Sequence, residues 1–95
     1  MPKGYVVARI DVHDADGFEE FKRMSGPVIK EHGGRVLVRD PSPDVREGSG
    51  TGVVIVVEFD SPEAARVFYE SQGYTDAKRV REAAARTELV LATGL

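Results

Sequence analysis

A run of β-branched residues near the middle of the chain limits the possible folds more than any other feature. The segment Gly52-Val53-Val54-Ile55-Val56-Val57-Glu58-Phe59 contains six large apolar residues, of which five are β-branched. Such a run is typical of a strand that is buried on both faces. After it, Ser61-Pro62-Glu63 is typical of a helix start, with a serine cap and a proline in the first turn. We therefore expect a central strand around which the other elements are arranged.

Alternation of side chains predicts three further strands. Apolar residues alternate with others over residues 5–12, 35–39 and 87–93, which is the two-residue period of a strand. In the second of these strands, Val36 and Val38 are expected on the side that faces the helices. Residues 40–51 are rich in proline, glycine and serine and form a connection that is long for a hairpin. This connection is a candidate lid over a binding site.

Apolar residues at helical spacing predict a long helix between the first two strands. Asp14 or Asp16 would cap its start, because a short acidic side chain accepts hydrogen bonds from the free N–H groups of the first turn. Pro27 lacks an N–H group and is expected to kink or loosen the helix. His32-Gly33-Gly34 would end it, since glycine readily adopts the left-handed conformation that is common after a helix.

A second helix is expected from Ser61 to Gly73, and Thr75 would cap a short third helix before the last strand. The element order is then β-α-β-β-α-β with an extra short helix. This is the split βαβ, or ferredoxin-like, arrangement of an α+β fold. A chain of this length suits one domain, so we expect residues 1–95 to form a single ferredoxin-like domain.

The sheet face turned away from the helices is expected to be unusually apolar. By alternation it carries six apolar residues and six that are polar or charged: Val7, Leu37, Val54, Val56, Val90 and Ala92, with Tyr5, Arg9, Asp11, Arg35, Arg39 and Glu58. A hydrated sheet face is normally polar, and an exposed apolar patch marks an interaction surface. We therefore predict a homodimer in which two sheets face each other as a dimeric α+β barrel, with the charged residues around a partly buried space. The alternative is a half-hydrated face whose charged residues interact with water.

Composition argues against several classes of partner. The net charge is −3 and the 31% of charged residues are of both signs, whereas surfaces for nucleic acid or anionic membranes need clustered lysine and arginine. A sheet that binds RNA would also need aromatic residues on its central strands, where Tyr5 stands alone. The chain has no cysteine and no apolar segment of membrane-spanning length. We expect a cytoplasmic protein that binds neither nucleic acid nor membranes.

Three segments of the chain form a recognisable set. They are Glu31-His32-Gly33-Gly34-Arg35-Val36-Leu37-Val38-Arg39, Glu58-Phe59-Asp60-Ser61-Pro62-Glu63-Ala64-Ala65, and Phe68-Tyr69-Glu70-Ser71 with Tyr74. In this order they resemble the signature of the bacterial family known as domain of unknown function 1330, and the resemblance extends over nearly the whole chain. It implies a dimeric α+β barrel of ferredoxin-like protomers. It implies no particular substrate or catalytic residue.

The candidate catalytic residues are His32 and Asp11. His32 could act as a general base near neutral pH, or it could simply cap the helix that ends at two glycines. Asp11 could move a proton, or it could pair with a cation on the same sheet face. Arg35 could bind a carboxylate or phosphate of a substrate, or form a salt bridge with Glu58 or Asp11.

The candidate substrate-binding residues besides Arg35 lie in two groups. Arg9, Arg39 and Glu58 could contact an anionic or polar ligand, or could form ion pairs within the sheet. The hydroxyls of Tyr69 and Tyr74 could donate to a ligand, or the rings could belong to the core with their oxygens at the surface.

No metal site and no cofactor are expected. His13 and His32 flank a helix of about 17 residues, which places them roughly 25 Å apart in one protomer. The spacing of ligands that is typical of zinc sites is also missing from the sequence.

Three functions remain compatible with these observations. The first is a small-molecule site between the sheet and the helices, with an anionic ligand held by Arg35 and with chemistry that needs no cofactor. Dimeric barrels of this fold include isomerases and cofactor-independent monooxygenases, although a fold does not fix a function. The second is a non-catalytic ligand-binding module. The third is a purely structural dimerisation module, whose interior would be packed solid and dry.

Overall fold

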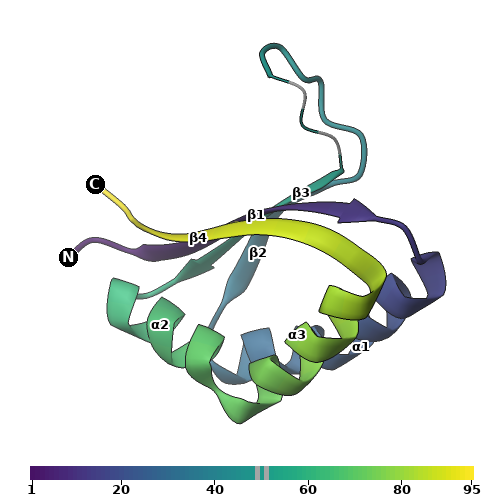
Figure 1. Cartoon of the computed structure of the whole chain (residues 1–95). Coiled ribbons are helices and arrows are strands. Elements are labelled where there is room, and N and C mark those ends of the chain that lie inside the picture. The colour runs from purple at the N-terminus through teal and green to yellow at the C-terminus, as the bar shows by residue number, and fades with distance from the viewer. Residues whose placement is uncertain (49, 51) are drawn as a thin grey trace.

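A computed structural model of the 95-residue chain describes residues 1–48, 50 and 52–95. The described residues form four strands and three helices in the expected order (Figure 1). The elements are β1 Gly4–Val12, α1 Ala15–Glu31, β2 Arg35–Asp40, β3 Val53–Phe59, α2 Pro62–Glu70, α3 Gln72–Ala84 and β4 Ala85–Thr93. Residues 41–48 of the predicted connection rise from the sheet on the side opposite the helices, and residues 49 and 51 of that connection lie outside the described residues.

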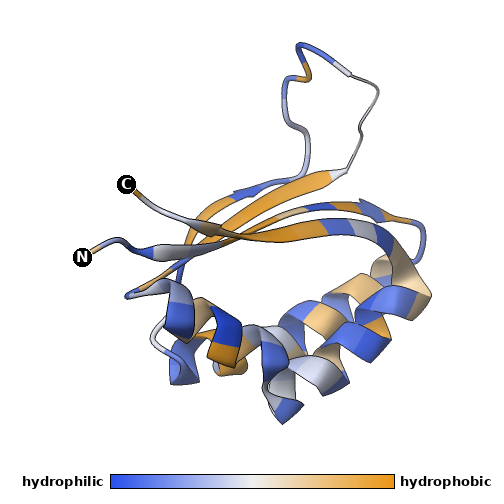
Figure 2. Cartoon of the chain, turned by 60° about the vertical axis from the view of Figure 1, so that its left-hand side comes forward, coloured by the Kyte–Doolittle hydropathy of each residue, from blue (hydrophilic) through white to orange (hydrophobic). Residues whose placement is uncertain are grey.

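The four strands form one antiparallel sheet in the order β2-β3-β1-β4, and the helices cover one of its faces (Figures 1 and 2). This is the ferredoxin-like α+β arrangement that the sequence predicts. The run of β-branched residues is β3, which lies between two neighbours, as expected of a central strand. The other inner strand is β1, which pairs with both β3 and β4.

An aromatic cluster fills the space between the sheet and α2. Phe59 of β3 is fully buried, and its ring centroid lies 4.9 Å from that of Phe68 in α2. The Phe68 ring lies 4.7 Å from the ring of Tyr74 in α3. Tyr74 also meets the edge of Phe21 from α1, at a centroid distance of 6.3 Å. These contacts join all three helices to the sheet, and aromatic pairs add to the stability that burial of their area provides.

The first helix begins as predicted and continues further than its proline suggests. Asp14 is its cap, and the Asp14 carboxylate accepts a hydrogen bond from the backbone N–H of Gly17 at 3.2 Å. The helix continues through Pro27 to Glu31 and ends before Gly33, which has a φ of 74°. Left-handed backbone of this kind favours glycine, because other residues crowd their Cβ atom there.

The predicted boundary between the second and third helices is wrong. Gly73 does not end a helix but lies in the first turn of α3, and Thr75 is not a cap. Ser71 separates the two helices: its hydroxyl donates to the Phe68 carbonyl of α2 at 2.7 Å and accepts from the Tyr74 N–H of α3 at 3.2 Å. One serine therefore satisfies free backbone groups of both helices. The third helix, with 13 residues, is longer than the second, with nine.

The assignment of Val38 and Arg39 to the two faces of the sheet is also wrong. Val36 pairs with Val57, but Val38 pairs with Val56, so one residue of β2 has no counterpart in β3. Such a β-bulge reverses the alternation that follows it. Val38 therefore lies on the face away from the helices, and Arg39 lies on the helix side.

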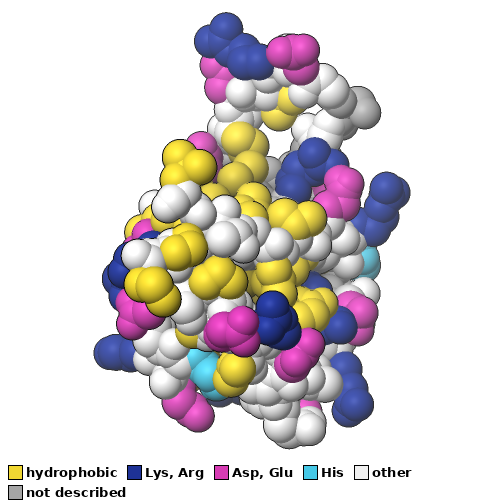
Figure 3. Space-filling model, turned by 90° about the vertical axis from the view of Figure 1, so that its left-hand side faces the viewer, with side chains coloured by type: hydrophobic (Ala, Val, Ile, Leu, Met, Phe, Trp, Pro, Cys, Tyr) yellow, Lys and Arg dark blue, Asp and Glu magenta, His cyan; other side chains and the backbone are white. Residues whose placement is uncertain are grey.

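The face of the sheet away from the helices, here called the open face, is not covered by any described element of the chain. Counted across the strands, Val38, Val56, Val7 and Val90 form a row that crosses all four strands on this face. Val56 and Val7 are half-buried, while Val38 and Val90 are exposed. The expectation that β3 is buried on both faces is therefore wrong for the protomer. Figure 3 shows apolar side chains gathered below the projecting connection.

Candidate functional site

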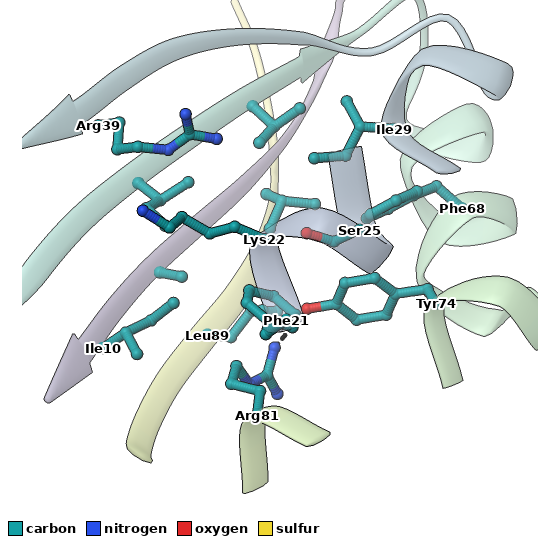
Figure 4. A pocket seen from close by; sticks show the side chains of 14 residues that line it. Ile10, Phe21, Lys22, Ser25, Ile29, Arg39, Phe68, Tyr74, Arg81 and Leu89 are labelled. Carbon is teal, nitrogen blue, oxygen red and sulfur yellow. Dashed lines mark hydrogen bonds between the residues drawn. The ribbon is translucent and has the colours of Figure 1, made fainter. Parts of the chain in front are cut away.

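A cavity lies between the helix side of the sheet and the helices (Figure 4). Nine apolar side chains, one tyrosine and four other polar residues line it: Val6, Ala8, Ile10, Phe21, Ile29, Ile55, Val57, Phe68, Leu89 and Tyr74, with Lys22, Ser25, Arg39 and Arg81. Its free volume is about 30 Å³, within a hollow of about 450 Å³ that includes open solvent at its mouth. The closed part has room for one or two waters, so an organic ligand needs side chains at the opening to move.

Arg81 is the most unusual residue of the cavity. It lies on the buried stripe of α3 and only 4% of it is exposed. Its guanidinium lies over the rings of Phe21 and Tyr74, at 5.4 and 5.7 Å from their centroids, and Nη1 donates to the Tyr74 hydroxyl. Nε is buried and has no hydrogen-bond partner. Among the described residues no carboxylate lies within 4.0 Å of this charge.

Tyr74 places its hydroxyl in the cavity beside Arg81 (Figure 4). Burial raises the pKa of this phenol, and the neighbouring Arg81 opposes the rise. The phenol therefore carries its proton at neutral pH. Because its oxygen accepts from Arg81, that proton is free to be donated to a bound molecule.

Two flexible cations lie at the opening of the cavity. Arg39 is the exposed member of the lining, and the β-bulge in β2 is what turns it to this side. Lys22 of α1 is half-buried, pairs with Glu19 at 2.7 Å and lies 5.4 Å from the Phe18 ring centroid. None of the residues that line the cavity is acidic. The cavity is thus apolar inside and positively charged at both its closed end and its opening.

His32, a predicted catalytic residue, lies outside the cavity lining. Its Nδ1 lies 2.9 Å from the carbonyl oxygen of Val28, and its ring meets the edge of Phe68 at a centroid distance of 5.9 Å. A carbonyl can only accept, so Nδ1 carries the hydrogen in this contact. This geometry is that of the helix cap that the sequence analysis gave as the alternative to a general base.

Arg35 and Glu58 form an ion-pair network on the open face and do not reach the cavity. Arg35 donates to Glu58 and to Asp60, both at 3.1 Å, and the Tyr5 hydroxyl donates to Glu58 at 2.8 Å. The Tyr5 hydrogen bond, followed by that of Arg35, holds the pKa of Glu58 below its ordinary value. Arg35 likewise lowers the pKa of Asp60, with a smaller contribution from Lys3.

The remaining predicted residues are divided between the two faces. Arg9 pairs with Glu88 on the open face, where Asp11 is exposed opposite Arg86 of β4. Tyr69 is half-buried on α2, with the Lys78 ammonium 5.2 Å from its ring centroid, and it does not line the cavity. Of the eight residues named as catalytic or substrate-binding from the sequence, the structure brings Tyr74 and Arg39 to the cavity.

Sequence reasoning missed Arg81, Lys22 and Ser25 as parts of this cavity. A signal for Arg81 was present, because Tyr74, Ala77, Arg81 and Ala84 recur at helical spacing and are all buried. A charged residue within an apolar stripe is costly unless something compensates its charge.

Neither a metal site nor a membrane-spanning segment is found in the part of the chain that the structure describes. No group of three or more histidine, cysteine or acidic side chains there is arranged to hold a metal ion. No described helix is both long enough and apolar enough to cross a bilayer.

Solved structures resemble this fold over nearly its whole length. A protein of unknown function from Rhodopseudomonas palustris is 19% identical, with a TM-score of 0.81 over 99% of this chain and 83% of that chain. SnoaB, a cofactor-independent oxygenase from Streptomyces nogalater, is 16% identical, with a TM-score of 0.66 over 100% and 95%. A dimeric protein of unknown function and ferredoxin-like fold from Bacteroides fragilis is 9% identical, with a TM-score of 0.64 over 95% and 94%.

These identities are low, so the likenesses establish the fold alone. No curated protein matches the sequence. The profile of one family, described as a domain of unknown function, matches residues 3–95. The chain belongs to this family, DUF1330, as the three segments of its sequence indicate.

Proposed function

We propose that the protein is a homodimer that binds an apolar small molecule in the cavity between its sheet and its helices. The observation that carries this proposal is the lining of the cavity, which is apolar over most of its surface and polar at a few points. Ligand sites typically combine an apolar wall with a few polar groups that fix the orientation of the ligand. A purely structural module would have no reason to keep in its core an arginine without a carboxylate partner.

The open face supports the dimer. The row of four valines across its centre is flanked by two rows of mainly polar residues, of which one contains Arg35, Glu58 and Tyr5 and the other Arg9 and Glu88. An apolar centre with a polar rim is the usual composition of a protein interface. Arg9 and Arg35 are each paired with a carboxylate of the same face, so a second copy meets no excess of like charge. A neighbour of the same fold, from Bacteroides fragilis, is described as dimeric.

The binding proposal is tested by filling the cavity. Ala8 is buried on β1 and lines it, so Ala8→Leu should occupy the space that a ligand needs. We expect benzoate or benzamide, followed by ¹⁵N–¹H NMR, to shift the resonances of cavity residues in the wild type and not in Ala8→Leu. Ala83→Leu, on the exposed side of α3, should bind as the wild type does. If neither compound shifts cavity resonances in the wild type, the proposal is wrong.

A second candidate function is an oxygenase that needs no cofactor, which the Tyr74 hydroxyl inside the cavity favours. The fold neighbour SnoaB is described as such an enzyme. In this reaction the organic substrate supplies all four electrons that reduce O₂: a CH₂ group becomes a carbonyl, one oxygen atom of O₂ enters the product, and the other leaves as water with the two hydrogens of the CH₂ group. Tyr74 would hydrogen-bond the enolate formed when the CH₂ loses a proton.

This candidate is tested with an oxygen electrode and indane-1,3-dione, whose CH₂ group is acidic. We expect oxygen uptake by the wild type and at least a tenfold loss in Tyr74→Phe, which removes the hydroxyl and keeps the ring. Tyr69→Phe, outside the cavity, is the matched control. Uptake that is absent from the wild type or equal in Tyr74→Phe would contradict it.

A further inference from the structure

We infer that the cavity selects an apolar carboxylic acid and that Arg81 binds its carboxylate. This inference rests on the proposed small-molecule site and specifies the chemical class of its ligand. It replaces Arg35, the anion-binding residue expected from the sequence, because Arg35 is already occupied by Glu58 and Asp60.

The buried Arg81 guanidinium lacks a hydrogen-bond acceptor for its Nε. An arginine remains charged in proteins, and burying a charge without a partner is strongly unfavourable. Two aromatic rings and the Tyr74 hydroxyl compensate part of this cost. Nε nevertheless stays without a hydrogen bond, in a residue that lines the cavity. The missing partner is therefore an acceptor that would sit in the cavity itself.

One edge of the Arg81 guanidinium has the geometry that binds a carboxylate. Nη1 is engaged by Tyr74, which leaves Nε and the neighbouring Nη2 as the free edge of the guanidinium. This edge presents two parallel N–H groups, the arrangement that matches both oxygens of a carboxylate. The Tyr74 hydroxyl can donate a third hydrogen bond from the side.

The rest of the lining sets the nature of the ligand body. It offers apolar side chains from the sheet and the aromatic rings of Phe21 and Phe68. Because the wall is mainly apolar, a carboxylate on a hydrocarbon or aromatic body fits it better than a phosphate, which needs more donors. Arg39 at the opening adds a positive charge, with no lining carboxylate to repel an acid. Positive charge around an entrance also speeds the capture of an anion.

Benzoate and benzamide test the inference, because they have nearly the same shape and differ in charge. Both are titrated at constant ionic strength into ¹⁵N-labelled protein, and the side-chain Nε–H resonance of Arg81 is followed with the backbone amides. We expect benzoate to bind at least tenfold more tightly than benzamide and to move the Arg81 signal, since a charged hydrogen-bonded pair in a buried site is worth at least that factor.

The variant Arg81→Met keeps a long apolar side chain and removes the charge. It should bind benzoate and benzamide equally, whereas Arg79→Met, the same change at an exposed position of α3, should keep the wild-type preference. Without ligand, Arg81→Met should melt at the wild-type temperature or above it, because removal of an unpaired buried charge relieves its desolvation. A purely structural role for Arg81 would instead lower the melting temperature and leave the preference for benzoate intact.

The outcomes separate the inference from the proposal on which it rests. Equal binding of benzoate and benzamide to the wild type, or a preference for benzoate that survives in Arg81→Met, overturns the role of Arg81 but keeps the small-molecule site. Binding of neither compound at the cavity overturns both. Shifts confined to arginines of the open face would show that benzoate binds only adventitiously, and would also overturn the inference.

Discussion

Two arginines of this chain show how the environment decides the role of a residue. Arg35 is about half-exposed and is shared by two carboxylates, so its charge is already used within the protein. Arg81 is buried against two aromatic rings, without a carboxylate partner among the described residues. Both carry the same charge, but only Arg81 is buried without a carboxylate, so only its desolvation can be compensated by a ligand.

The network around Glu58 gives a prediction at the residue scale. Tyr5→Phe removes the hydrogen bond that contributes most to the low pKa of Glu58, so the pKa of this carboxyl should rise toward its ordinary value. The side-chain carboxyl ¹³C shift of Glu58, followed between roughly pH 2 and 7, measures this change. Tyr69→Phe, which lies away from Glu58, is the control. An unchanged titration of Glu58 in Tyr5→Phe would contradict the assigned cause.

The same pKa shift fixes the sign of the pH dependence of stability. A carboxyl whose pKa is lower in the folded state stabilises the fold above its unfolded-state pKa, and this contribution is lost as the pH falls through the folded-state value. Glu58 and Asp60 both belong to this class. The melting temperature should therefore decrease as the pH drops below about 4. This decrease should be smaller in Tyr5→Phe than in the wild type.

The functional residues were harder to predict than the apolar core, for a physical reason. Phe18, Phe21 and Phe68 are buried where the helical spacing of large apolar residues indicates the core, because burial of such groups follows the period of the helix. Arg35 and Tyr74 looked equally able to bind a ligand, since the sequence does not show which charges pair. Whether an arginine meets a carboxylate depends on strand register, which links residues far apart in the chain.

At the scale of elements, one extra residue in β2 redirects the end of the strand. Strict alternation from Arg35 onward places Arg39 on the open face, but the bulge between Val36 and Val38 moves it to the cavity. The sequence around Leu37 contains no glycine or proline that would mark a bulge. The helix boundary at Ser71 was missed for a similar reason: Gly73 was the stronger stop signal, yet a serine cap can end one helix and start the next.

The proline in α1 gives a prediction at this scale. Pro27 lies inside the helix and exposed to solvent, where it removes one backbone hydrogen bond. Pro27→Ala should therefore raise the free energy of unfolding, by up to about 3 kcal/mol, as measured by urea denaturation. Lys30→Ala, at another exposed position of α1, should change it by less than about 0.5 kcal/mol. A destabilised Pro27→Ala would mean that the helix depends on the proline ring.

At the scale of the whole molecule, the two faces of the sheet have different tasks in this account. The helix side holds the cavity, and the open face is the surface that we propose for a second copy. The order of elements and the apolar open face follow from the sequence, because they rest on alternation over many residues. The bulge makes the open face more apolar, since it brings Val38 into the row with Val56, Val7 and Val90.

The mass in solution tests most directly whether the open face binds a second copy of the chain. Light scattering at low micromolar concentration should give twice the 10.4 kDa of one chain. Val56→Asp, which places a charge in the row of valines, should reduce the mass to that of one chain, because a buried unpaired carboxylate is strongly unfavourable. Val67→Asp, at an exposed position of α2, should remain dimeric. A wild-type mass of 10.4 kDa would contradict the account and leave the open face without its proposed partner.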